Sequence, residues 1–220
     1  MSTASVQPDP APAASDDDGG ARRFELLAGL TLAVFAAVLA VVDLGGGKYG
    51  DDEIIGTNEK ASLYQWYQSK SIKQAIVEQQ QGLLTALLDA GAVAPAGIGA
   101  VTAQIAAADE EVKRYDAEKN ELLRGSAAVG AAGQVLEVDG QKGQIIGTEA
   151  WEGTLATLGA AGDKFDLSTL WLQLSLVLGA VSLVLQAQRL KTIFYAAMVL
   201  GGVVGTVFGV LAFQVAMTLG

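Results

Sequence analysis

The sequence predicts an all-α membrane protein with three transmembrane helices and an extramembrane α-helical hairpin domain. Three apolar runs carry this prediction, and they cover residues 24–44, 170–186 and 193–217. A helix needs about 20 mostly apolar residues to cross a hydrocarbon core about 30 Å thick, and these runs have that length. They are too long and too continuous for barrel strands, so helices are expected to satisfy their backbone polar groups in lipid.

Basic residues beside the apolar runs predict the orientation in the membrane. Arg22 and Arg23 precede the first run, and Arg189 and Lys191 lie between the second and the third. Lys and Arg in such short flanks favour the cytoplasmic side, and one arrangement satisfies both pairs. We therefore expect an integral membrane protein with a cytoplasmic N-terminus, while residues 45–168 and the C-terminus are extracytoplasmic.

The predicted domain organisation follows from the same runs. Residues 1–21 are rich in Pro, Ala, Ser and Asp without apolar periodicity, so they are expected to form a disordered tail. Residues 22–44 form the first span, which we interpret as a retained anchor because it is longer than the apolar part of a signal peptide. Residues 45–168 form a mostly helical domain, and residues 169–187 and 193–218 form the second and third spans.

Small residues recur along one face of each span. They lie at Gly201, Gly205 and Gly209 in the third span, Gly29, Ala33 and Ala37 in the first, and Ser175, Gly179 and Ser182 in the second. Helices in lipid associate by close packing of their backbones, which small residues allow. Two interpretations stay open here: the strips pack inside one three-helix bundle, or the glycine face of the third span docks on another subunit.

The predicted domain begins with a glycine-rich segment and a long amphipathic helix. Residues 45–50 contain four glycines and are expected to form a flexible exit from the first span. A helix is then predicted from residue 57 or 58 to about residue 90. Its apolar face is expected to contain Trp66, Ile72, Ile76, Val77, Leu83, Leu84, Leu87 and Leu88. The opposite, polar face is expected to contain Gln68, Gln74, Glu78 and Thr85.

A second helix is predicted for residues 101–123, antiparallel to the first. Beyond it, the dipeptide Asp139-Gly140 between residues 134–138 and 144–146 predicts a short β-hairpin with a type I′ turn, and a glycine-rich loop is the alternative. A further helix is expected from Thr148, leading directly into the second span.

The composition excludes several kinds of chemistry. The chain contains no cysteine and no histidine, so thiol catalysis, disulfides and imidazole-based acid–base or metal sites cannot form. Its net charge of −10 disfavours binding to nucleic acid. We therefore predict no catalytic residue, no metal site and no cofactor, and the protein is not expected to be an enzyme.

One constellation in the first helix of the domain suggests binding. Lys70 and Lys73 lie about one turn apart, close to Trp66. Such residues can contact anionic lipid headgroups or a partner at the bilayer surface. The alternative is a helix that packs through Trp66 and exposes its lysines to solvent.

The same segment resembles a protein family. Asn58, Ala61-Ser62 and the run Trp66-Tyr67-Gln68-Ser69-Lys70-Ser71-Ile72-Lys73-Gln74 are similar to the signature of uncharacterised bacterial membrane proteins, grouped as domain-of-unknown-function family four-three-three-seven. The resemblance implies one span, a helical segment and two closely spaced spans. It implies no activity, cofactor or catalytic residue. The chain departs from the usual family pattern at residues 91–99 and 125–147.

Two functions are consistent with these expectations. The first is a structural or accessory subunit that assembles with copies of itself or with a larger membrane complex. Its small-residue faces and outer hairpin would then form the contacts. The alternative is a lipid- or ligand-sensing module that uses Trp66, Lys70 and Lys73. Membrane lipids and further protein subunits are the expected partners.

Overall fold

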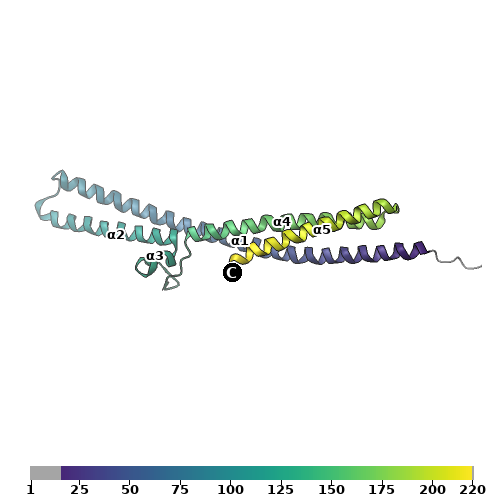
Figure 1. Ribbon diagram of the computed structural model, residues 1–220. Coiled ribbons are helices and arrows are strands. Elements are labelled where there is room, and N and C mark those ends of the chain that lie inside the picture. Colours follow the sequence, from purple (N-terminus) through teal and green to yellow (C-terminus); the bar gives the residue numbers. More distant parts are fainter. Residues whose placement is uncertain (1–15, 220) are drawn as a thin grey trace, which may run out of the picture. The chain divides into compact units, whose positions relative to one another are not determined.

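The protein is almost entirely α-helical over residues 16–219, which the computed structural model describes (Figure 1). The helices are α1 (Asp16–Asp89), α2 (Ile98–Arg124), α3 (Ser126–Gly133), α4 (Thr148–Val184) and α5 (Gln188–Ala216). Two 3₁₀ turns cover Pro95–Gly97 and Met217–Leu219, and two short strands, β1 (Glu137–Val138) and β2 (Gln141–Lys142), pair with each other. Three helices, α1, α4 and α5, are long and apolar enough to cross a membrane.

The chain divides into two compact units, to which α1, α4 and α5 all contribute. The apolar bundle contains the described residues up to 46 together with residues 163–213. The hairpin unit contains residues 47–162 together with residues 214–219. Each unit has its own packing pattern, so each is described by itself.

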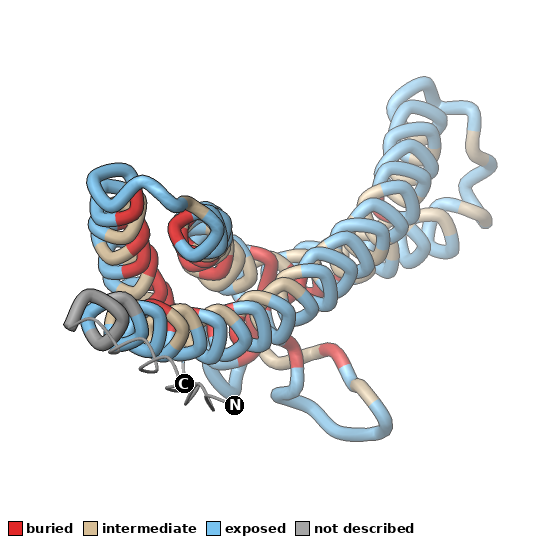
Figure 2. Tube along the Cα trace, turned by 90° about the vertical axis from the view of Figure 1, so that its right-hand side faces the viewer, coloured by how far each residue is buried: buried red, intermediate tan, exposed pale blue. Residues whose placement is uncertain are grey.

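Buried residues of the apolar bundle follow a heptad spacing. Along α4 they lie alternately three and four positions apart, at Phe165, Ser168, Leu172, Ser175, Gly179 and Ser182. In α1 they lie seven apart, at Ala28, Phe35 and Val42. This spacing keeps one face of each helix directed at its neighbours, as in a left-handed bundle. The buried positions appear as red stripes along the bundle helices in Figure 2.

The glycine-rich segment at residues 45–50 is helical, so the prediction of a flexible exit was wrong. It lies inside α1, which continues without interruption to Asp89. A Cβ atom added at Gly45 would lie 2.5 Å from Phe213 Cζ and 3.0 Å from Phe165 Cε1. Gly45 is therefore needed for close packing against two aromatic rings, which themselves meet edge to face at 5.0 Å.

The predicted helical hairpin is present in the hairpin unit. The distal part of α1 and α2 lie side by side and antiparallel (Figure 1). Gly91, with φ of +65°, ends the first helix, and the 3₁₀ turn at Pro95–Gly97 begins the return. Residues of α2 that face the partner helix alternate four and three positions apart, at Val101, Ile105, Ala108, Val112, Tyr115, Lys119 and Leu122.

The predicted apolar face of α1 was partly wrong. Val77, Leu84 and Leu88 are half-buried as expected. However, four other apolar residues of that face are exposed: Ile72 (63%), Ile76 (59%), Leu83 (62%) and Leu87 (40%). Gln74, which was placed on the opposite face, is buried. The apolar arc of α1 is wider than the contact surface of α2, and the helix is rotated so that only one edge of the arc is covered.

The segment at residues 125–147 is ordered and contains the predicted β-hairpin. Glu137 pairs with Lys142, and Val138 pairs with Gln141. The paired residues lie closer to the turn than the strands that we predicted, at residues 134–138 and 144–146. Asp139 (φ +52°) and Gly140 (φ +74°) form the turn, and two positive φ angles in succession are the signature of type I′. The short helix α3, interrupted at Gly130 (φ +70°), was not predicted.

Helices α1 and α5 begin before the boundaries that we predicted for them, whereas α4 agrees with the prediction. Helix α1 begins at Asp16, so residues 16–21 of the predicted tail are helical, and residues 1–15 of that tail lie outside the described part. Helix α4 runs from Thr148 to Val184 and thus joins the domain to the second span, as expected from the sequence. Helix α5 already begins at Gln188, which shortens the predicted link between the second and third spans.

Candidate functional site in the polar layer of the hairpin

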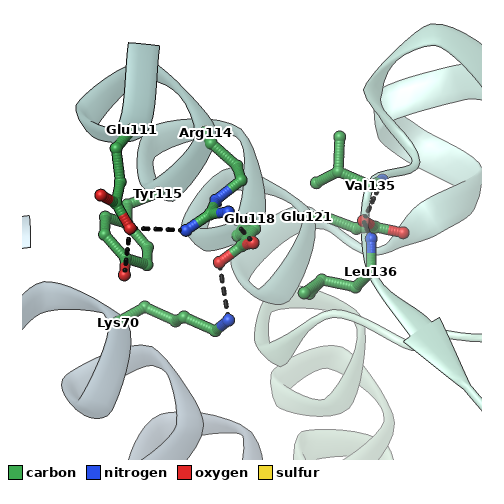
Figure 3. Close-up of polar contacts among 8 residues, drawn as sticks. All are labelled: Lys70, Glu111, Arg114, Tyr115, Glu118, Glu121, Val135 and Leu136. Atoms are coloured by element: carbon green, nitrogen blue, oxygen red, sulfur yellow. Dashed lines mark hydrogen bonds and ion pairs between the residues drawn. The ribbon is translucent and has the colours of Figure 1, made fainter. Parts of the chain in front are cut away.

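A layer of polar side chains interrupts the apolar contact between α1 and α2 (Figure 3). We call it the polar layer, and its members are Lys70 and Gln74 from α1 with Glu111, Arg114, Tyr115, Asp116 and Glu118 from α2. Lys70 Nζ lies 2.7 Å from Glu118 Oε2, and their side chains are 17% and 11% exposed. This ion pair therefore lies largely between the helices.

Further contacts surround this ion pair. Arg114 donates to Glu111 Oε1 at 2.8 Å, and the Tyr115 hydroxyl donates to the same oxygen at 3.1 Å. Arg114 also lies over the Tyr115 ring, 5.0 Å from its centre. On the α1 side, Gln74 Nε2 donates to Glu78 at 2.7 Å and to Asp116 at 3.1 Å. The acidic groups of the layer are thus held by donors from both helices.

One helical turn beyond this layer, Glu121 anchors the segment at residues 125–147. Its side chain is fully buried, and its carboxyl group accepts three hydrogen bonds. Ser126 Oγ donates to Oε1 at 2.7 Å, whereas the backbone N–H groups of Val135 and Leu136 both donate to Oε2 at 2.8 Å. Figure 3 shows Glu121 directed at these two amides. Three donors on one buried carboxyl group satisfy the requirement that buried polar groups be paired.

Glycines and a small apolar cluster complete this anchor. Gly125 has a φ of +87°, and a Cβ atom at Gly147 would collide with the backbone of residues 123–125. The two chain segments can therefore cross only where both residues lack a side chain. Beside the crossing, Leu122, Leu136 and Ile145 form a buried cluster. Its half-buried neighbours are Leu63, Trp66, Tyr67, Val135 and Val138.

The outer face of α2 carries charges that pair with one another. Lys113 lies 2.7 Å from Asp109 and 3.0 Å from Glu110. Hydrogen bonds from these two carboxylates raise the pKa of Lys113 above its usual value, with their charges as the next cause. Between α1 and α4, the hydrogen bond from Lys60 lowers the pKa of Glu152 below its usual value, because it stabilises the charged carboxylate. The exposed surface of α2 is therefore solvated and ionic.

The arrangement supports a structural role for the polar layer. Within residues 16–219, no group of three or more acidic residues is placed to hold a metal ion. Buried polar pairs between two helices determine which residues face each other, because a shifted register would leave the charges unpaired. The layer therefore sets the register of the hairpin.

The glycines predicted on the third span pack inside the chain. A Cβ atom at Gly205 would lie 2.7 Å from Leu172 Cγ and 3.1 Å from the carbonyl oxygen of Ser168, while the Ser168 hydroxyl donates to the Gly205 carbonyl at 2.7 Å. At Gly201 the nearest atom is Ser175 Cβ, at 3.5 Å. This face of α5 is thus occupied by α4, which agrees with the first of the two interpretations.

Gly209 is closely packed, whereas the predicted strip of Gly29, Ala33 and Ala37 is not. A Cβ atom at Gly209 would lie 2.8 Å from Val42 Cγ2, so α5 also contacts α1 closely. By contrast, Ala33 and Ala37 are exposed, and a Cβ atom at Gly29 would meet nothing within 4 Å. The buried residues of α1 are instead the heptad series described above. The predicted strip of the first span therefore lies on the outer surface of the bundle.

The three residues of the predicted binding constellation are not gathered into one site. Trp66 packs on the cluster around Leu122, and Lys70 is paired with Glu118. Only Lys73 is exposed. Contact of Trp66 and Lys70 with lipid would require the hairpin unit to give up its own packing.

Glu118, Glu121 and Gln74 are the important residues that sequence reasoning missed. A signal was present in the sequence of α2. Glu118 and Glu121 directly precede Lys119 and Leu122, two positions of the heptad series that faces α1, so both glutamates lie at the edge of this contact. No equivalent signal marks Gln74, because a glutamine in an amphipathic helix is usually a surface residue.

Replacing Lys70 by alanine is expected to destabilise the hairpin unit by about 1–3 kcal/mol, because the largely buried Glu118 would lose the nearer of its two cationic partners and keep only the more distant contact with Arg114, at 3.6 Å. Lys73→Ala is the matched control, three residues away and exposed, and its effect should be within about 0.5 kcal/mol. Thermal unfolding of both variants in detergent checks this. An equal loss of stability in the two variants would show that the ion pair between Lys70 and Glu118 does not stabilise the hairpin unit.

These features define a class: an all-α protein that has, within residues 16–219, three helices long and apolar enough to cross a membrane, and a helical hairpin whose register a polar layer sets. The chain belongs to the family described as "Domain of unknown function (DUF4337)", which matches residues 25–215. No curated protein and no solved structure matches the chain. The resemblance seen in the sequence is thereby confirmed at the level of the family.

Proposed function

We propose that the protein is a non-enzymatic, integral membrane protein that serves as a structural or accessory subunit. The single observation that carries this proposal is the row of large apolar residues left exposed on the hairpin unit, from Ile72 to Leu87. Contiguous exposed apolar side chains on a surface facing water indicate a protein contact. The hairpin, kept in register by its polar layer, would present this row to a partner.

The proposed location is the inner membrane of a bacterium, with the N-terminus in the cytoplasm and residues 45–168 outside it. A contact inside the apolar bundle supports this orientation. Lys191 Nζ lies 3.2 Å from Glu25 Oε1, so Arg22 and Arg23 in the first part of α1 and the basic residues at the start of α5 are at the same end of the bundle. The positive-inside rule requires such a clustering of basic residues on one side.

The orientation can be tested with single cysteines, because the chain has none of its own. Lys73→Cys in intact cells or spheroplasts should react with a membrane-impermeant maleimide. Gln186→Cys, in the link between α4 and α5, should react only after the membrane is opened. The reverse pattern would contradict the proposed orientation.

The assembly itself is tested by gentle extraction of the protein from its own membrane, followed by native mass determination and identification of co-purifying chains. A homo-oligomer or a stoichiometric complex with another membrane protein is the expected result. A single chain that carries only lipid would contradict the structural role.

A further inference from the structure

The exposed row on α1 belongs to a longer stripe with no charged residue in it. Exposed residues recur every three or four positions on this side of the helix, at Ile54, Asn58, Ala61, Gln65, Ser69, Ile72, Ile76, Gln79, Leu83 and Leu87. We call this the neutral stripe. Among the charged side chains of the same stretch, the exposed Lys73 borders the stripe, whereas Glu59, Lys70 and Glu78 lie on other sides of α1.

The neutral stripe contrasts with the other exposed surface of the hairpin. The outer face of α2 carries the paired charges around Lys113 described above. A helix face of a solvated hairpin normally carries such charges, particularly in a chain with a net charge of −10. An exposed stripe of apolar and amide side chains at helical spacing has instead the composition of a helix–helix contact.

We infer that the neutral stripe is the contact surface for a second copy of this chain, an inference that rests on the proposed role in assembly. Charge is the argument for a second copy. In a symmetric pair the same surface meets itself, so a charged residue near the two-fold axis would face the equal charge of its own counterpart. The neutral stripe has none, and its Asn, Gln and Ser side chains each carry both donor and acceptor groups, which allows them to bond to their own kind.

The shared membrane determines how the two copies meet. Both copies have the same orientation in one membrane, so residues of equal number lie at equal height in a symmetric pair. Leu83 of one copy therefore packs against Leu83 of the other.

Cysteine cross-linking of the full-length protein in its native membrane tests this inference. Leu83→Cys should give a disulfide-linked dimer when a mild oxidant is added, and Ile72→Cys should do the same. Thr85→Cys is the matched control, because Thr85 is also exposed but lies two residues away, on another side of α1. It should stay monomeric while it still reacts with maleimide.

The possible results separate the inference from the proposed function. If Leu83→Cys forms no more dimer than Thr85→Cys while gentle extraction still yields a complex, the stripe does not bind a second copy, and the structural role stands. Cross-linking of Leu83→Cys to a different protein would likewise show that the stripe does not bind a second copy, while the structural role would stand. If extraction yields only single chains, both proposals fail. Leu83→Glu provides an independent variant, because it places two equal charges opposite each other and should abolish the dimer, whereas Thr85→Glu should keep it.

Discussion

Replacing Glu121 by leucine should destabilise the hairpin unit by about 3–5 kcal/mol, the largest loss that we expect from one polar substitution. The leucine fills a similar volume but accepts no hydrogen bond. The Ser126 hydroxyl and the amides of Val135 and Leu136 would then be buried without their acceptor, and each such group costs about 1–3 kcal/mol. Residues 125–147 should lose their order first, since Glu121 connects them to α2.

Glu121→Gln is the informative control for this substitution. Its amide oxygen can accept the two backbone N–H groups, and its NH₂ group can donate to Ser126 Oγ, because a hydroxyl group has two acceptor positions. The expected loss is about 1 kcal/mol, from the weaker bonds of a neutral acceptor. Hydrogen exchange at the amides of residues 135 and 136 should accelerate strongly in the leucine variant and little in the glutamine variant. Equal exchange in both variants would contradict the proposed role of the carboxyl group.

Gly205→Leu should separate α5 from α4 and destabilise the apolar bundle by about 3 kcal/mol or more. The added side chain would start 2.7 Å from Leu172 Cγ and close to two backbone atoms, the Leu172 nitrogen at 3.0 Å and the Ser168 oxygen at 3.1 Å. Backbone atoms of a packed helix cannot rotate away as a side chain can. The hydrogen bond from Ser168 to the Gly205 carbonyl would be lost as well.

Gly29→Leu serves as the matched control in the same bundle. Gly29 is also a helical glycine of the apolar bundle, but its surroundings are open within 4 Å. Its replacement should leave the thermal unfolding temperature in detergent nearly unchanged, whereas Gly205→Leu lowers it clearly. If Gly29→Leu proved as harmful as Gly205→Leu, the strip of the first span would be a contact surface after all.

The sequence predicted the helices well because their signals are long and redundant. An apolar run of about 20 residues, or a heptad series such as the one that ends at Leu122, repeats the same information several times. The turn at Asp139-Gly140 was also predictable, because few dipeptides tolerate two positive φ angles. These features depend on local sequence alone.

The errors arose where one residue type serves two purposes. Glycines at residues 45–50 can make a chain flexible or let helices pack closely, and only the rings of Phe165 and Phe213 reveal which applies. The apolar arc of α1 contains two rows of residues, one that ends at Leu84 and Leu88 and one that ends at Leu83 and Leu87. The sequence alone does not show which of the two rows packs against α2. The role of Glu121 depends on amides 14 and 15 residues away, which no local pattern reveals.

The number of chains per assembly in the native membrane tests the central claim most directly. It can be counted from the photobleaching steps of single assemblies in which every chain carries one fluorophore. The account predicts two or more steps for the unmodified chain and a single step for Leu83→Glu. A single step for both would contradict the contact between two copies, because the exposed apolar residues of α1 would then have no second copy to cover them.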